Sequence, residues 1–181
     1  KKQIKIWCGA ASTGQEPYSL CMILKELGPK VAGWDIPIIG TDLCVEALEK
    51  AKAATYTQFE VQRGMPIQML MKYFTQDGER WKLNDEIKSM VKFGLFNLMN
   101  DPKAVGMGFD IVFLRNVLIY FDVETKKKVL EGISKIMPSD GVIFLGGAET
   151  VLGVTKAFEP YPDLRGVYRQ SQAEAEQEVP Q

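Results

Sequence analysis

The chain has 181 residues, of which 46% are hydrophobic and 25% are charged, and its formal net charge is -1 at pH 7. This composition is typical of a soluble, well-packed domain, and the balanced charge gives no overall basic field that would favour nucleic acid or an anionic membrane as a partner. The sequence contains no histidine, which excludes histidine general bases, histidine metal ligands and histidine-dependent catalytic triads.

The cysteines and the lack of long apolar runs indicate a compartment. Cys8, Cys21 and Cys44 have no metal-ligand spacing, and we interpret all three as reduced residues of the core. We find no signal peptide and no apolar run of membrane-spanning length. The sequence therefore predicts a cytoplasmic protein without membrane insertion and without a metal site.

The first predicted unit is a buried strand, a loop of small residues and a helix. The run Ile4–Cys8 is followed by the loop Gly9–Gly14, and Pro17 suits the first turn of a helix that ends at Gly28. Small residues let backbone amides approach a ligand closely, and a helix N-terminus favours a polar or anionic group. An ordinary strand-to-helix turn is the alternative.

A second predicted strand, near Ile36–Thr41, ends at the acidic residue Asp42. A carboxylate in this position can accept hydrogen bonds from both hydroxyls of a ribose. Together with Glu16 at the mouth of the first helix, it predicts a nucleoside cofactor. The loop lacks the glycine fingerprint that holds a pyrophosphate, so S-adenosylmethionine fits better than a nicotinamide dinucleotide. Asp42 as the N-cap of a helix at Leu43–Ala54 is the alternative.

The strand, helix, strand, helix rhythm implies a parallel sheet, and it breaks after Ala54. Gln76–Arg80 is a turn signal between two short β-prone stretches, which predicts a β-hairpin. We place this hairpin in a small inserted β-subdomain at about residues 56–92. Alternatively, the hairpin only covers a sheet edge.

The sheet is predicted to resume after the insertion. Phe109–Leu114 is a continuous apolar run, the form expected of a central parallel strand. Asp122 is expected to cap the next helix, whose lysines Lys126–Lys128 are interpreted as a solvated face. The other predicted strands are Met90–Phe93, Phe96–Leu98, Val142–Leu145 and an antiparallel closing hairpin of Lys156–Glu159 with Gly166–Arg169.

Four segments form a recognisable series: Ala10–Ser19, Gly40–Asp42, Phe96–Leu98 and Phe113–Phe121. In this order they resemble the CheR-type chemotaxis receptor methyltransferases, and the resemblance continues to Gly166–Arg169. It implies an α/β, Rossmann-like S-adenosylmethionine-dependent methyltransferase domain at residues 1–170. The polar stretch at residues 171–181 has little to bury, and we expect it to be disordered.

The resemblance implies how the cofactor is bound. Asp42 would take the ribose hydroxyls, and Glu16 would lie at the charged amino-acid end or the sulfonium side of S-adenosylmethionine. Asn97 and Leu98 would bracket the adenine. Asn116, at the carboxyl end of a central strand, would also lie against the cofactor.

Two further residues are candidates for catalysis. Arg115 would contact the cofactor beside Asn116, and Tyr120 matches a family tyrosine near the transferred methyl group, where a phenol could orient the incoming carboxylate. The alternatives are a structural ion pair for Arg115 and a core aromatic role for Tyr120.

The implied reaction transfers a methyl group from S-adenosylmethionine to glutamate side chains on the cytoplasmic helices of chemoreceptors, leaving S-adenosylhomocysteine. A glutamate with its unperturbed pKa of about 4.3 is ionised at pH 7, so no general base is needed.

Alternative functions remain. CheR-type enzymes usually carry a basic helical N-terminal domain, whereas this chain begins at the first strand, so a binding or docking module without turnover is the main alternative. A small-molecule methyltransferase should show a lid, and a nicotinamide oxidoreductase should show the glycine fingerprint.

Overall fold

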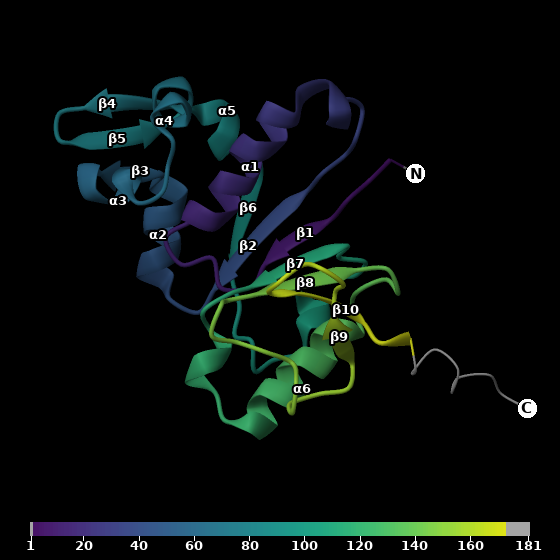
Figure 1. Ribbon diagram of the computed structural model, residues 1–181. Coiled ribbons are helices and arrows are strands. Elements are labelled where there is room, and N and C mark those ends of the chain that lie inside the picture. The colour runs from purple at the N-terminus through teal and green to yellow at the C-terminus, as the bar shows by residue number, and fades with distance from the viewer. Residues whose placement is uncertain (1, 173–181) are drawn as a thin grey trace, which may run out of the picture. The chain divides into compact units, whose positions relative to one another are not determined.

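Helices alternate with strands in the computed structural model, which describes residues 2–172 (Figure 1). The chain forms two units. One contains the first residues of the chain and Ala11–Leu95, and the other contains Ile4–Ala10 and the described chain from Phe96 onward. Each unit has its own parallel strand pairing and its own buried side chains.

The first unit has two longer helices and a pair of parallel strands. These are α1 (Gln15–Leu27), α2 (Val45–Ala53), β2 (Ile38–Asp42) and β6 (Val91–Leu95), with a short 3-10 helix η1 (Gly28–Val31) after α1. Tyr18 joins the helices, because its buried hydroxyl donates a hydrogen bond to the Ala51 carbonyl at 2.8 Å. Burial raises the pKa of Tyr18, so this hydroxyl stays a donor at neutral pH.

Between α2 and β6 lies an inserted three-stranded antiparallel sheet, at the upper left of Figure 1. Its strands, in the order β3-β5-β4, are β3 (Thr55–Thr57), β5 (Arg80–Leu83) and β4 (Phe74–Asp77), and its helices are α3 (Gln58–Gln62), α4 (Ile67–Tyr73) and α5 (Asp85–Lys88). The predicted hairpin is confirmed, because β4 pairs with β5 around a turn in which Gly78 has φ +61°.

The strands of the second unit follow the order β1-β7-β8-β10-β9. They are β1 (Ile6–Cys8), β7 (Ile111–Leu114), β8 (Val142–Leu145), β10 (Val167–Gln170) and β9 (Phe158–Pro160). The first three are parallel, and β10 is antiparallel to both β8 and β9, which confirms the predicted closing hairpin.

Helix α6 (Val123–Ser134) and two 3-10 helices, η2 (Pro102–Ala104) and η3 (Leu118–Tyr120), complete the second unit. Asp122 caps α6 as predicted, since its side chain accepts a hydrogen bond from the Thr125 backbone N–H at 2.8 Å. Hydrogen bonds from Thr125, first from its side chain and then from its backbone N–H, lower the pKa of the Asp122 carboxyl.

The predicted disordered tail at residues 171–181 lies, from residue 173 on, outside the described residues. Among residues 2–172, none of the helices is long and apolar enough to cross a membrane.

The prediction that all three cysteines belong to the core is wrong for one of them. Cys8 and Cys21 are buried, whereas Cys44 is exposed. Cys44 is the N-cap of α2, so it precedes the helical repeat whose buried positions are Leu48 and Ala51. A residue outside this repeat is not turned inward with the helix face.

We expect a maleimide to modify Cys44 rapidly in the folded protein, and to modify Cys8 and Cys21 only after unfolding. Burial raises the pKa of the Cys21 thiol to about 12, which leaves almost no reactive thiolate at neutral pH. Peptide mapping by mass spectrometry measures the three rates. Equal rates for Cys21 and Cys44 would contradict the burial of Cys21 against the core.

Candidate functional site

Asp42, the last residue of β2, holds the loop that leads into α1. One carboxylate oxygen accepts a hydrogen bond from the Ser12 N–H at 2.8 Å, and the other accepts one from the Cys44 N–H at 2.9 Å. The Ala11 N–H also donates to the Thr41 carbonyl at 2.9 Å. The N-cap of α2 is Cys44, so the alternative that Asp42 is that N-cap is wrong.

The turn into α1 requires glycine at position 14. Gly14 has φ +92°, in the left-handed region that other residues rarely adopt. A Cβ at Gly14 would lie 3.0 Å from the Cβ of Ala51 and 3.1 Å from the ring of Tyr18. The glycine at position 14 therefore lets α1 approach α2 closely.

Glu16 lies in the first turn of α1 and is partly buried. A carboxylate in this position is favoured by the partial positive charge of a helix N-terminus. The neighbouring loop is also fixed by the inserted subdomain, because the Tyr56 hydroxyl donates to the Thr13 carbonyl at 2.7 Å. Loop, helix start and strand end are thus tied together within the first unit.

The predicted adenine contacts, Asn97 and Leu98, follow β6 in the chain and belong to the second unit. The prediction that Phe96–Leu98 is a strand is wrong, because β6 ends at Leu95 and the chain then turns. The Asn97 side-chain carbonyl accepts a hydrogen bond from the Met99 N–H at 2.9 Å, which closes a local turn. This turn leaves Leu98 beside Gly9. A Cβ added to Gly9 would lie 3.5 Å from a methyl group of Leu98.

Arg115 and Asn116 directly follow β7, as predicted, and both are exposed. Asn116 has φ +59°, an uncommon conformation for a residue other than glycine. Tyr120, at the end of η3, is 79% exposed, so the alternative that Tyr120 is a core aromatic is wrong. Its phenol is open to solvent on the same loop as Arg115.

The sequence interpretation did not identify one residue near this loop, Glu149. Glu149 is buried, and its carboxylate accepts backbone hydrogen bonds from both the loop after β7 and the loop after β8. The available signal was an acid placed shortly after the buried strand Val142–Leu145, which is the same signal that identified Asp42 after β2.

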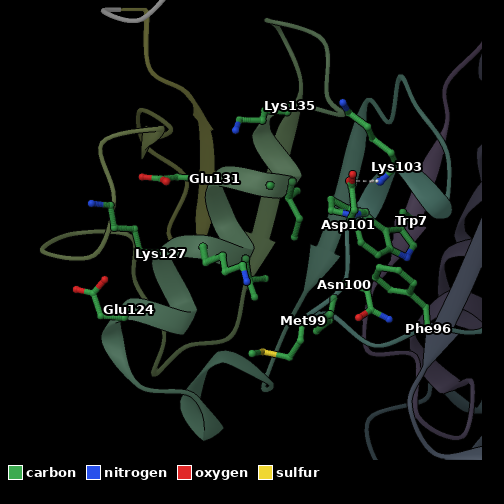
Figure 2. Close-up of a pocket in the computed structure, with 16 residues that line it drawn as sticks. Trp7, Phe96, Met99, Asn100, Asp101, Lys103, Glu124, Lys127, Glu131 and Lys135 are labelled. Carbon is green, nitrogen blue, oxygen red and sulfur yellow. Dashed lines mark hydrogen bonds between the residues drawn. The ribbon is translucent and has the colours of Figure 1, made fainter.

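A cavity of about 640 Å³ lies in the second unit between α6 and the segment Phe96–Lys103 (Figure 2). Trp7 and Phe96 form one side of it, while Glu124 and Glu131 of α6 point away from them. Of the residues predicted to bind the cofactor, Leu98 alone lines this cavity. The residues that line this cavity therefore do not include the loops after β7 and β8.

Within residues 2–172, no group of three or more histidine, cysteine, aspartate or glutamate side chains is placed to hold a metal ion.

Solved structures place the fold in a class. The chain is similar to a TehB-like SAM-dependent methyltransferase from Corynebacterium glutamicum, with a TM-score of 0.52 and 14% identity over 94% of this chain and 79% of that one. It is also similar to PKMT2 from Rickettsia typhi in complex with AdoHcy, with a TM-score of 0.50 and 13% identity over 80% of this chain and 20% of that one. The predicted Rossmann-like fold of S-adenosylmethionine-dependent methyltransferases is thus confirmed.

Sequence comparison identifies the family. The profile of the CheR methyltransferase SAM-binding domain matches residues 1–166, and the chain belongs to this family. The chemotaxis protein methyltransferase of Vibrio parahaemolyticus is 38% identical over 88% of this chain and 58% of its own length. Chemotaxis protein methyltransferase 1 of Pseudomonas aeruginosa is 39% identical over 83% of this chain and 56% of its own length.

The family match also bears on the cofactor. The predicted cofactor, S-adenosylmethionine, is confirmed by the SAM-binding domain. The chain spans less than two thirds of the length of these two relatives.

We expect Gly14→Ala to lower the free energy of unfolding by about 1–3 kcal/mol, since it adds both backbone strain and a crowded methyl group. Gly33→Ala is the matched control, because Gly33 also has a positive φ, of +77°, but has open space around its Cβ position. Chemical denaturation gives both values. A loss at Gly14 no larger than the loss at Gly33 would contradict the close approach of α1 to Ala51.

Proposed function

We propose that this chain is the catalytic domain of a protein-glutamate O-methyltransferase that modifies the cytoplasmic helices of chemoreceptors. The observation that carries the proposal is membership of the CheR SAM-binding domain family over residues 1–166. The names of the relatives, chemotaxis protein methyltransferases, support a receptor as the substrate. Because this substrate is cytoplasmic, we place the enzyme in the cytoplasm. The methyltransferase domain would comprise residues 1–170.

The first unit would bind two parts of the cofactor. Asp42 is the ribose ligand in this proposal, because its two oxygens are fixed by backbone N–H groups and a carboxylate can accept more than two hydrogen bonds. Glu16 would receive the amino-acid end or the sulfonium side, since a carboxylate attracts either positive group.

The second unit would bind the adenine and carry the catalytic side chains. Asn97 and Leu98 offer an amide and an apolar surface to the adenine. Arg115 and Asn116 would lie against the cofactor, and Tyr120 would orient the glutamate that accepts the methyl group. The exposure of Tyr120 supports this role, because a phenol must be accessible to meet a protein substrate.

The chemistry needs little from the protein beyond orientation. S-adenosylmethionine supplies a methyl group on a positively charged sulfur, and transfer to a carboxylate oxygen breaks the carbon–sulfur bond and gives a neutral ester and a neutral thioether. No proton moves, which agrees with a sequence that has no histidine. Alignment of the reacting atoms can contribute up to about 7–11 kcal/mol, and exclusion of water from the carboxylate would add to it.

Asp42→Ala is expected to weaken binding of S-adenosylhomocysteine by more than about tenfold, or about 1.4 kcal/mol. The reason is the loss of the ribose acceptor together with the loss of the Ser12 N–H anchor. Calorimetric titration measures the affinity. Asp77→Ala is the control, since Asp77 is ion-paired with Lys82 in the inserted hairpin. Unchanged affinity in Asp42→Ala would make the ribose assignment wrong.

Methyl transfer itself is testable with tritium-labelled S-adenosylmethionine and a purified cytoplasmic fragment of a chemoreceptor. We expect the label to enter the fragment as carboxyl methyl ester, which mild base releases as methanol. A fragment with its candidate glutamates replaced by alanine is the control.

Label that resists mild base would contradict glutamate as the acceptor. Binding of S-adenosylhomocysteine without any transfer would favour a binding module over an enzyme.

A further inference from the structure

The Glu149 carboxylate is an unusual anchor in the second unit. Glu149 is 8% exposed. Its carboxylate accepts four hydrogen bonds, all from backbone N–H groups. One oxygen accepts from Asn116 at 2.6 Å and Gly146 at 2.8 Å. The other accepts from Val117 at 3.1 Å and Ile119 at 3.2 Å.

These four bonds explain how a buried charge is tolerated. A carboxylate taken out of water is costly unless its oxygens are hydrogen-bonded, and bonds to an ionised acceptor are stronger than neutral ones. A carboxylate has about four acceptor positions, so the four N–H groups use its capacity. Glu149 therefore serves the backbone of the loop that carries Arg115 and Tyr120.

The anchor is itself held in place. The Glu149 N–H donates to the Gly146 carbonyl at 3.0 Å, which fixes the turn after β8. The hydroxyl of Tyr168, a buried residue of β10, donates to the Glu149 carbonyl at 3.4 Å. The backbone of Glu149 is thus held by the turn after β8 and by a side chain of β10.

The loop after β7 is shaped around this carboxylate. Asn116 is held at φ +59° with its N–H directed at Glu149. A Cβ at Gly146 would lie 2.4 Å from the Asn116 side-chain oxygen and 2.7 Å from the carboxylate. The packing therefore leaves no room for a side chain at position 146.

We propose that Glu149 is a positioning residue for the cofactor and methyl-transfer site, acting by fixing the loop Arg115–Tyr120. This rests on the proposed function, which assigns that loop to the cofactor. Glu149 acts through the backbone, and its four acceptor positions are already used within the protein. Glutamine cannot replace it, because its amide NH₂ would face two N–H donors that need an acceptor.

The test compares Glu149→Gln with Glu159→Gln. Glu159 is a carboxylate of the same unit that is ion-paired with Arg169 at 2.8 Å on the closing hairpin. Amide hydrogen exchange of residues 115–119 and calorimetric affinity for S-adenosylhomocysteine are measured well below the unfolding temperature. In Glu149→Gln we expect exchange about tenfold faster or more and affinity about fivefold weaker or more, with neither change in Glu159→Gln.

Each contrary result has a distinct meaning. Exchange and affinity in Glu149→Gln equal to those of Glu159→Gln would overturn the positioning role. Faster exchange with unchanged affinity would overturn the connection between the loop and the cofactor. Failure of the wild-type chain to bind S-adenosylhomocysteine would instead contradict the proposed function, and the exchange data would still test the anchor.

A variant that does not fold leaves a direct measurement on the wild-type protein. The amides of Asn116, Val117 and Ile119 should then be protected from exchange as strongly as those of β7. Fast exchange at these three amides would overturn the proposal.

Discussion

Carboxylates that accept backbone N–H groups hold the loops on which the candidate site depends. Asp42 fixes Ser12 and Cys44 in the first unit, and Glu149 fixes four N–H groups in the second. Loops that leave a parallel strand have amides with no strand partner, and these amides can bond to other acceptors. Here the acceptors are side-chain carboxylates, so the loops have a defined shape before any ligand binds.

This arrangement suits the chemistry proposed for the family. Transfer of a methyl group to an ionised carboxylate moves no proton, so rigid placement of the reactants is more useful than a side chain that titrates near neutral pH. The lack of histidine agrees with this requirement. The Tyr120 side chain is largely exposed, but the backbone beside it is fixed, because the Ile119 N–H within η3 donates to Glu149.

Local features of the sequence predicted most of the fold and only part of the candidate site. The apolar run Phe109–Leu114 and the turn Gln76–Arg80 predicted β7 and the inserted hairpin, because strand burial and turn chemistry are encoded by neighbouring residues. Glu149 was missed because its partner Asn116 lies 33 positions away. Exposure of Cys44 was missed because residue type predicts burial only on average.

The most direct measurement is the change in backbone amide NMR signals when the wild-type chain is titrated with S-adenosylhomocysteine. If the anchored loops bind the cofactor, the signals of Ser12 and Asp42 should shift together with those of Leu98 and Asn116, at one common affinity. Shifts confined to other places, such as the cavity beside α6, would contradict the assignment of these loops to the cofactor.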